Sequence, residues 1–308
     1  LHSLGNALAN LVVGNGAGHN QPGEFANCTS ANGSCSLIYT SNGTVVLTAT
    51  AASGSTFTGW SGGCAGTSLS CVVVIGSATG VTATFQLAGS AYQQAVVGSG
   101  PVGYWRLGEA SGVVAGDVMG VNPGAYVNGP LLGQSSLVPS DSGNLSVGFD
   151  GVDDQVRVSD SASLDVSGAL SLEAWIRPGA LPAAGSFASV LTKPESYSLQ
   201  FNGPRLEFTI VQSGARRRLQ APVGAVVAGQ TYHVVGTFDG SVQRLYLNGA
   251  LVAPTSLSGA ASVTTSSVFL GSWGGTGEFF NGRIDDAAVY ASALTGTTVT
   301  THYNTGTT

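Results

Sequence analysis

Charged side chains are scarce in this sequence. Ten of its 308 residues are Lys or Arg and 16 are Asp or Glu, a charged fraction of 8%, where about 25% is usual for a soluble domain. The net charge of −6 excludes the basic surface on which sequence-independent nucleic-acid binding depends. One basic cluster stands out, Arg216-Arg217-Arg218, and three adjacent arginines are typical of a solvated strand or loop.

Long hydrophobic runs are also missing. The apolar residues, 43% of the total, are spread without any run of about 18, so no membrane-spanning helix is predicted. The same apolar content excludes a disordered chain, because disorder goes with low hydrophobicity and high net charge. There is no initiator Met and no recognisable signal peptide, so we expect a processed or excised piece of a longer protein.

The charge is unevenly distributed and divides the chain in two. Residues 1–90 contain one charged side chain, Glu24, whereas all other charges lie in residues 91–308. Such a break in composition predicts two structural units. A nearly uncharged first unit lacks the usual defence of β-strand edges against association, so we expect a partner, a sugar or a second copy of the chain to cover its surface.

All four cysteines lie in the first unit, in two pairs of the form C-x6-C without zinc-site spacing. This pattern predicts two local disulfides and an oxidising compartment. Crossed pairing and four free thiols remain as alternatives. The predicted bonds join Cys28 to Cys35 and Cys64 to Cys71.

Leucines at helical spacing predict a short helix within residues 1–11, at Leu1, Leu4, Leu8 and Leu11. The pattern then changes to strands. An Asn42-Gly43 turn precedes residues 44–50, in which Val45, Leu47 and Ala49 share one face. Asn-Gly between strand-like runs is a strong hairpin signal, because both central residues of a type I′ turn need positive φ.

Residues 43–64 end in Gly59-Trp-Ser-Gly-Gly-Cys64, and Val81-Thr-Ala-Thr-Phe85 follows Cys71. This stretch resembles the bacterial surface repeat related to the internalin B-repeat, over about residues 12–87. The resemblance implies a small β module of secreted and surface proteins, a spacer or interaction unit without catalysis. Phe57 and Trp60 are expected to form its core, stapled by the disulfides that a small unit needs.

Residues 88–100 are rich in Gly, Ser and Ala and are predicted to be a linker. Between residues 101 and 305 short strand-like runs recur at the spacing of an all-β sandwich, among them residues 170–177, 197–201 and 232–238. Asn202-Gly203, Asp239-Gly240 and Asn248-Gly249 are predicted hairpin turns. Hardly any helix is expected, so this unit should be two packed antiparallel sheets.

Several motifs of this region occur in the order found in the laminin-G-like, concanavalin-A-like jelly roll, which residues 91–305 resemble. The resemblance implies a jelly-roll β-sandwich. That scaffold serves lectins, adhesion modules, accessory domains of polysaccharide-degrading enzymes and structural spacers. The motifs are Tyr104-Trp-Arg-Leu-Gly-Glu109, Phe149-Asp-Gly-Val-Asp-Asp154, Ser171-Leu-Glu-Ala-Trp-Ile-Arg177, Tyr232-His-Val-Val-Gly-Thr-Phe-Asp-Gly240, Leu245-Tyr-Leu-Asn-Gly249 and Gly282-Arg-Ile-Asp-Asp-Ala-Ala-Val-Tyr290.

The sequence carries no recognisable catalytic pattern. Glycoside hydrolysis needs two carboxylates that share one substrate bond, but Glu173 has no second acid two residues away on its strand face. The adjacent pairs Asp153-Asp154 and Asp285-Asp286 should point to opposite faces if they lie in strands, and then cannot share one substrate bond. The histidines are scattered, and His233 is expected to be a packed strand residue. We therefore expect no enzymatic activity.

Calcium binding is better supported. Calcium takes six to eight oxygen ligands, and Gly-rich loops such as residues 116–126 free backbone carbonyls to point inward. In related jelly rolls such a loop and the last strand often hold a structural calcium ion, and the resemblance places the acids on Asp117 and Asp285 with carbonyls from Asn122 and Ala125. The alternative is that Asp117 caps a turn and Asp285 forms a hydrogen bond across the sheet.

Sugar recognition requires flat aromatic faces beside polar groups. Trp273 lies in the Gly-rich loop 271–277, where core packing is least expected. Two strands also alternate polar or aromatic side chains with aliphatic ones, which should point into the sandwich. The alternative is that Trp175 and Tyr246 only cover the sheet or lie buried under loops. The outward-facing candidates are Glu173, Trp175 and Arg177 on one strand and Arg244 and Tyr246 on the other.

These features predict a non-catalytic binding or adhesion protein, secreted or at the bacterial cell surface, whose lectin-like jelly roll recognises a polysaccharide or surface glycan. Two alternatives remain: a structural subunit of an extracellular filament or surface assembly, and an accessory module of a polysaccharide-degrading enzyme. The N-glycosylation sequons at Asn27, Asn32, Asn42 and Asn144 matter only if the source organism glycosylates.

Overall fold

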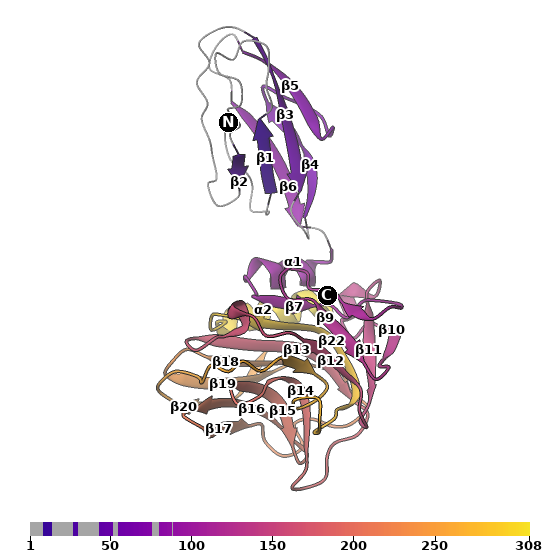
Figure 1. Cartoon of the computed structure of the whole chain (residues 1–308), viewed down its shortest axis with the longest axis vertical. Coiled ribbons are helices and arrows are strands. Elements are labelled where there is room, and N and C mark those ends of the chain that lie inside the picture. Colours follow the sequence, from indigo (N-terminus) through magenta and orange to yellow (C-terminus); the bar gives the residue numbers. More distant parts are fainter. Residues whose placement is uncertain (1–8, 14–26, 30–42, 52–54, 76–79, 88) are drawn as a thin grey trace. The chain divides into compact units, whose positions relative to one another are not determined.

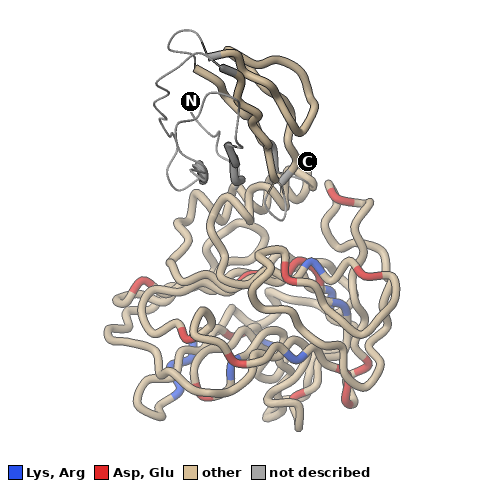
Figure 2. The backbone as a smooth tube through the Cα atoms, turned by 45° about the horizontal axis from the view of Figure 1, so that its top comes forward, with Lys and Arg blue, Asp and Glu red and all other residues tan. Residues whose placement is uncertain are grey.

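The computed structural model describes residues 9–13, 27–29, 43–51, 55–75, 80–87 and 89–308 (Figure 1). The chain divides into two compact units, Leu1–Gly89 and Ser90–Thr308. This division agrees with the break in charge, since the described part of the first unit carries no Lys, Arg, Asp or Glu (Figure 2).

The first unit is built of antiparallel strands. Four strands form one sheet in the order β2-β1-β3-β5, and β4 pairs with β6. The strands are β1 (Ala9–Val13), β2 (Asn27–Thr29), β3 (Gly43–Ala51), β4 (Ser55–Gly62), β5 (Ser70–Ile75) and β6 (Val81–Leu87).

The core of this unit follows the predicted alternation. Val45, Leu47 and Ala49 on β3 are buried, together with Trp60, whose Nε1 donates to the carbonyl oxygen of Ser68 at 2.7 Å. Phe57 packs against Trp60 with ring centroids 5.1 Å apart. These contacts confirm the two aromatic rings as core residues.

The Cys64–Cys71 disulfide is confirmed, with Cα atoms 6.2 Å apart. The predicted Cys28–Cys35 bond and Asn42-Gly43 turn lie outside the described residues. So does most of the predicted N-terminal helix, except that Leu11 lies in strand β1.

The second unit contains two eight-stranded sheets, which we name by a central strand. The β13 sheet has the order β10-β11-β22-β13-β18-β19-β20 with β7 paired to β22, and the β15 sheet has the order β17-β16-β15-β14-β21-β12-β9-β8. The first comprises β7 (Gly103–Trp105), β10 (Leu131–Ser135), β11 (Leu145–Asp150), β13 (Leu170–Pro178), β18 (Tyr232–Phe238), β19 (Val242–Leu247), β20 (Ala250–Ser256) and β22 (Asn281–Tyr290). The second comprises β8 (Val114–Ala115), β9 (Gly124–Val127), β12 (Gln155–Val158), β14 (Phe187–Lys193), β15 (Tyr197–Asn202), β16 (Arg205–Gln212), β17 (Ala215–Gln220) and β21 (Val268–Leu270).

The core lies between the two sheets, where both contribute every second side chain, such as Leu172 and Ile176 from β13 and Leu199 and Phe201 from β15. The predicted jelly-roll sandwich is therefore confirmed. The turn at Asn248-Gly249 has positive φ at both residues, 52° and 77°, as a type I′ turn requires. Two short 3₁₀ turns, Pro139–Asp141 and Ala162–Leu164, complete the connections.

Two helices correct the predicted boundaries. Helix α1 (Ala91–Gly98) occupies the range predicted to be a linker, and helix α2 (Gly296–Thr307) ends the chain. Ser90 caps α1, because its Oγ accepts the backbone N–H of Gln93. The linker prediction followed from the Gly/Ser/Ala content, but Tyr92 and Val96 are fully buried and hold the helix on the sandwich.

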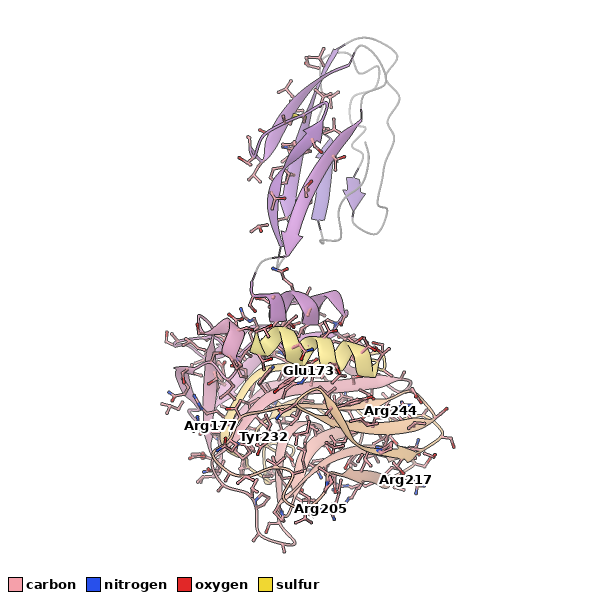
Figure 3. The ribbon with its side chains drawn as sticks, turned by 180° about the vertical axis from the view of Figure 1, so that it is seen from behind. Glu173, Arg177, Arg205, Arg217, Tyr232 and Arg244 are labelled. Atoms are coloured by element: carbon pink, nitrogen blue, oxygen red, sulfur yellow. A yellow bond between two sulfur atoms is a disulfide. The ribbon has the colours of Figure 1, made fainter. Side chains whose placement is uncertain are left out.

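The two helices contact each other and cover the outer face of the β13 sheet (Figures 1 and 3). A second cluster of buried side chains forms beneath them, with Tyr92 and Val96 from α1, Val299 from α2 and Trp175 and Tyr246 from the sheet. Within the described residues, no helix is long and apolar enough to cross a membrane.

Candidate functional site

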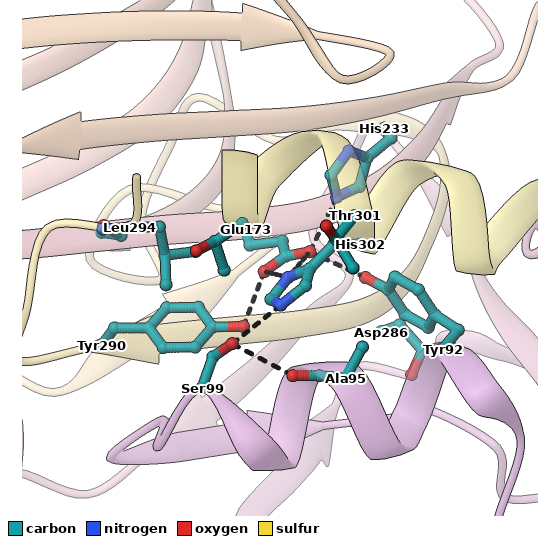
Figure 4. A network of polar contacts seen from close by, with 12 residues as sticks. Tyr92, Ala95, Ser99, Glu173, His233, Asp286, Tyr290, Leu294, Thr301 and His302 are labelled. Carbon is teal, nitrogen blue, oxygen red and sulfur yellow. Dashed lines mark hydrogen bonds and ion pairs between the residues drawn. The ribbon is translucent and has the colours of Figure 1, made fainter. Parts of the chain in front are cut away.

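A buried carboxylate lies at the centre of the interface between the helices and the β13 sheet (Figure 4). Glu173 is fully buried and its oxygens lie within hydrogen-bond distance of four side chains from four other elements. These are Tyr92 Oη on α1 (3.0 Å), Tyr290 Oη on β22 (2.6 Å), His233 Nε2 on β18 (2.7 Å) and His302 Nδ1 on α2 (3.0 Å). Glu173 thus joins both helices to three strands.

The hydrogen bonds assign the protons of the two histidines. Ser99 Oγ donates to the carbonyl oxygen of Ala95 at 3.0 Å, so it accepts from His302 Nε2 at 2.9 Å. His302 therefore donates from both ring nitrogens and is an imidazolium ion. His233 donates from Nε2 to the Glu173 carboxylate, and its buried Nδ1 has no hydrogen-bond partner among the described residues.

The electrostatics agree with this assignment. Burial disfavours the charged carboxylate, but the charge of His302 and the hydrogen bonds of both histidines outweigh it and hold the pKa of Glu173 well below its usual value. Burial also opposes protonation of His302, yet the adjacent Glu173 raises its pKa. The pair is a buried ion pair supported by two tyrosine hydroxyl groups.

This arrangement corrects part of the predicted sugar site. Glu173, Trp175 and Tyr246 do lie on the outer face of the β13 sheet, but helices α1 and α2 cover them and leave all three buried. Figure 3 shows Glu173 beneath α2. The alternative for Trp175 and Tyr246, burial, is therefore correct, although the segments that cover them are helices and not loops.

The arginines predicted beside them lie elsewhere. Arg177 is exposed, and Arg244 donates to Asp239 at 2.6 Å on the β18–β19 hairpin. Figure 3 shows both arginines away from Glu173. The structure therefore does not bring Glu173, Arg177 and Arg244 together into one site.

The oxygen atoms predicted to bind calcium accept hydrogen bonds from the protein instead. The Asp117 carboxylate accepts four backbone N–H groups, those of Tyr104, Met119, Val121 and Asn122, at 2.8–3.0 Å. The Asn122 carbonyl oxygen accepts Trp105 Nε1 at 2.7 Å. These atoms form a closed turn and do not fit a cation site.

The other two predicted ligands are also engaged. Ala125 lies in β9, in register with Val114 and Arg157 of the neighbouring strands. Asp285 is fully buried and accepts the backbone N–H of Leu137 at 2.7 Å and the Asn144 amide at 3.2 Å. Asp117 and Asp285 thus belong to two separate groups of hydrogen bonds.

Another acidic group has the chemistry of a cation site. Oxygen atoms of Asp150, Asp153 and Asp154 lie within 4.8 Å of one another. One oxygen of Asp150 accepts the backbone N–H of Val152 at 2.7 Å, and this bond chiefly lowers the pKa of Asp150. Burial raises the pKa of Asp154. Three carboxylates in a tight turn supply the oxygen ligands that a hard divalent cation prefers.

The outer face of the β15 sheet carries a second candidate site. Along β15 and β16 the inward side chains are aromatic and aliphatic, whereas all outward ones except Val211 are polar. Six outward side chains of β15, β16 and β17 form what we call the polar floor, and four of the six are at most 1% exposed. The polar floor consists of Ser198, Gln200 and Asn202 on β15, Glu207 and Thr209 on β16 and Gln220 on β17.

Glu207 organises the polar floor. Its Oε1 accepts from Gln200 Nε2 and Thr209 Oγ1, both at 3.0 Å. Its Oε2 accepts from Asn202 Nδ2 at 3.0 Å and Gln220 Nε2 at 2.9 Å. Because a carboxylate only accepts, all three amide groups turn their N–H toward Glu207.

Two buried oxygen atoms of the polar floor lack a partner. Ser198 Oγ and Gln200 Oε1 have no hydrogen-bond partner in the part of the chain that the structure describes. Buried polar atoms are nearly always paired, so each needs an explanation. Glu207 fixes the orientation of the Gln200 amide and so directs Oε1 away from the carboxylate. No described residue donates to that oxygen atom.

Aromatic rings and arginines flank the polar floor. The Arg216 guanidinium lies over the Trp273 ring, 4.4 Å from its centroid, and pairs with Glu195 at 2.7 Å. Arg218 lies 5.2 Å from the centroid of Phe187 and 3.7 Å from Glu207 Oε1. Trp273, predicted from its loop, is thus half-exposed beside this face. The alternation of Ser, Gln and Asn with apolar residues in 197–202 was the signal for the polar floor that sequence reasoning missed.

A separate hollow of about 530 Å³ lies between α2 and the β19–β20 hairpin. It is lined by Tyr246, Asn248, Leu251, Tyr303 and Asn304, among others. Tyr303 stacks against Trp175 with ring centroids 6.0 Å apart, so its ring closes the helix–sheet interface.

Two family models match the chain. Residues 150–300 match the Concanavalin A-like lectin/glucanases superfamily, and residues 25–89 match the divergent InlB B-repeat domain. A search of curated proteins finds no match.

Solved structures show the same fold at low sequence identity. The botulinum neurotoxin serotype D ligand binding domain in complex with N-acetylneuraminic acid aligns with a TM-score of 0.53 and 11% identity, over 67% of this chain and 51% of that one. The sialidase of Trypanosoma rangeli in complex with 2,3-difluorosialic acid aligns with a TM-score of 0.50 and 16% identity, over 66% and 32%. This chain thus spans about half or less of their length. The chain thus resembles the divergent InlB B-repeat domain over residues 25–89 and the Concanavalin A-like lectin/glucanases superfamily over residues 150–300.

Proposed function

We propose that this is a non-catalytic glycan-binding protein, secreted or at the cell surface, whose jelly roll binds a polysaccharide on the polar floor of the β15 sheet. The observation that carries the proposal is the pair of buried oxygen atoms, Ser198 Oγ and Gln200 Oε1, without partners beside the aromatic rings of Trp273 and Phe187. Convergent polar groups next to apolar rings are the usual composition of a small-molecule site.

The similar structures support this proposal at the level of the fold. Two of them are described as complexes with N-acetylneuraminic acid or a sialic acid derivative. The Cys64–Cys71 disulfide supports an oxidising compartment and therefore a secreted or surface location.

Calcium has a structural role in this proposal. Asp150, Asp153 and Asp154 would hold the ion, because their carboxylate oxygens converge in the turn between β11 and β12. A bound divalent cation would offset most of the negative charge of the three neighbouring carboxylates and stiffen the turn. No ligand contact of the polar floor depends on it.

Replacing Trp273 by Ala is expected to weaken polysaccharide binding about tenfold or more, which corresponds to about 1.4 kcal/mol. The reason is the loss of the half-exposed aromatic surface beside the polar floor. A glycan array with the full chain identifies ligands, and isothermal titration calorimetry, in calcium and in chelator, gives the affinity of each variant.

The matched control is Arg244→Ala, on the hairpin of the other sheet. It should bind like the wild type, since Arg244 lies away from the polar floor. Wild-type affinity for Trp273→Ala, or a loss confined to Arg244→Ala, would place the site elsewhere. No binding to any glycan in calcium contradicts the proposed function itself.

A structural subunit of an extracellular assembly is the second candidate, favoured by an apolar patch on the first unit. Val72 and Val74 on β5 are 61% and 71% exposed, and Val46 beside them on β3 is also exposed. Sedimentation velocity at increasing concentration tests this candidate. We expect association by the wild type and a monomer for Val72→Lys/Val74→Lys, and a monomeric wild type would contradict it.

A further inference from the structure

We infer that Glu207 positions the amide groups of Gln200, Asn202 and Gln220 to read the hydroxyl groups of an uncharged polysaccharide. The inference rests on the proposed function and names the class of its ligand. Glu207 contacts no ligand in this scheme and acts through the amides, so it is a positioning residue.

Glu207 fixes the direction of the three amides. Each of the three side chains donates an N–H to Glu207 at 2.9–3.0 Å, which fixes which end of each amide faces the carboxylate. The carbonyl oxygen of each amide is then directed away from Glu207. Three amides of fixed orientation offer both acceptors and remaining N–H donors, and a sugar hydroxyl group can donate to the first and accept from the second.

Gln200 Oε1 lacks a hydrogen-bond donor. Its Oε1 is buried without a partner among the described residues, and such an atom destabilises the folded protein until something donates to it. Ser198 Oγ, two residues before it on the same face of β15, is also without a partner among the described residues. Sugar hydroxyl groups, which donate and accept, satisfy both atoms, whereas a carboxylate or sulfate oxygen, which only accepts, can take the Ser198 proton but cannot satisfy Gln200 Oε1.

The charges around the polar floor disfavour an acidic ligand. Arg216 is paired with Glu195 and Arg218 with Glu207, so these two guanidinium groups already have a carboxylate. Arg217 alternates with them along β17 and is in register with Ile210, whose side chain is in the core. The Arg217 side chain therefore projects from the opposite face of the strand. Arg205 also faces outward, opposite Asn202, and donates to the carbonyl oxygen of Ala221. Glu278 adds a third carboxylate close enough to act on Arg216 and Arg218, so three arginines stand against three carboxylates and the face offers an acidic polysaccharide no net positive charge.

A ligand must also be able to reach the polar floor. Gln200 is 1% exposed, so a ligand reaches it only by moving the side chains above it. Arg216 and Arg218, with side chains 29% and 37% exposed, are long, end in solvent and can swing aside. Binding thus exchanges their contacts with Trp273 and Phe187 for contacts of the sugar.

The test measures binding of the full chain to two sets of soluble polysaccharides. The uncharged set is dextran, mannan, xyloglucan and arabinogalactan, and the acidic set is polygalacturonate, alginate and hyaluronan. We expect binding within the uncharged set, with an affinity that changes less than twofold between low and high salt. Salt-sensitive binding of the acidic set alone overturns the inference and leaves the proposed function standing. Binding of neither set contradicts both.

Three variants test the role of Glu207. Gln200→Ala and Glu207→Gln should each weaken binding of the uncharged polysaccharide at least tenfold, while Arg157→Ala, on the outer face of β12 in the same sheet, should bind normally. The double variant Gln200→Ala/Glu207→Gln should lose no more affinity than the single variant with the larger loss, because Glu207 acts through the amides and Gln200 is one of them.

Additive losses in the double variant would overturn the positioning role, as would normal binding by Gln200→Ala. Thermal unfolding of each variant separates binding from folding. If Glu207→Gln fails to fold, Gln200→Ala and Asn202→Ala still decide the inference, since normal binding by both variants would overturn it.

Discussion

Replacing Glu173 by Gln is expected to lower the free energy of unfolding of residues 90–308 by about 3–5 kcal/mol, the usual cost of removing one partner from a buried ion pair. Glu173 accepts from His302, His233, Tyr92 and Tyr290 at a position without access to water. A Gln side chain has one acceptor oxygen and brings two donors of its own. It would leave His302 without a counter-charge and at least one tyrosine hydroxyl without an acceptor.

The stabilisation by Glu173 and His302 depends on pH in a defined window. The pKa of Glu173 is held below its usual 4.5, so its contribution is present above pH 4.5 and is lost as the pH falls through the folded value. The pKa of His302 is raised above its usual 6.5, so its contribution is complete below pH 6.5 and is lost as the pH rises through the folded value. The pair therefore stabilises the fold most between pH 4.5 and 6.5.

Calorimetric unfolding of the full chain measures this effect. A loss of about 3–5 kcal/mol corresponds to a Tm about 6–20 °C lower for a unit of this size. The control is the same substitution in an exposed ion pair, Glu195→Gln, which should cost at most about 1 kcal/mol. A Tm for Glu173→Gln equal to that of the control would show that the helices do not depend on this carboxylate.

The two helices explain why Glu173 could not be placed from the sequence. Its strand was predicted correctly, and so was its outward direction, because alternation specifies the face of a strand. What covers that face depends on residues far away in the chain. Helix α2 is mostly Thr, Gly and Asn, which are poor helix formers, and it is held by tertiary contacts of Val299, His302 and Tyr303.

The sandwich itself was predictable for the opposite reason. Its strands are specified by local alternation and its hairpins by turn residues such as Asn248-Gly249, and both signals lie within a few residues. The polar floor lies between these cases. Its outward residues were visible as an alternating pattern, but the convergence of Gln200, Asn202 and Gln220 on Glu207 depends on the register of three strands.

Replacing Asp285 by Asn is expected to stabilise the protein at pH 8 and to flatten its pH dependence. Asp285 and Asp286 are adjacent and fully buried. Burial, followed by the charge of Asp286, raises the pKa of Asp285 well above its usual value. Burial also raises the pKa of Asp286 to about 6, against the opposing charge of Arg106 and the hydrogen bond from Tyr104.

The direction of the effect follows from proton binding. Both aspartates have raised pKa values, so between pH 4 and at least pH 6 the folded state binds more protons than the unfolded state. Stability is therefore highest below pH 4 as far as this pair is concerned and falls as the pH rises through the folded values. At low pH the Glu173–His302 pair has the opposite effect, because its stabilisation is lost as the pH falls. Together the two pairs favour maximum stability at mildly acidic pH.

Asn at position 285 imitates the protonated form of Asp285. The two aspartates share a hydrogen bond, in which the neutral partner donates, and an amide N–H can take that role while the amide oxygen still accepts the backbone N–H of Leu137. The Asn144 amide then loses its bond to position 285 and keeps the one to Asp286. Urea unfolding of the wild type and Asp285→Asn between pH 4 and 8 measures the slope. Asp239→Asn, a change of the same kind at an exposed turn, should keep the wild-type slope above pH 5. If Asp285→Asn destabilises at pH 8 as much as at pH 4, then hydrogen bonds that require a carboxylate outweigh the repulsion, and the adjacent acids stabilise the last strand as an ionised pair.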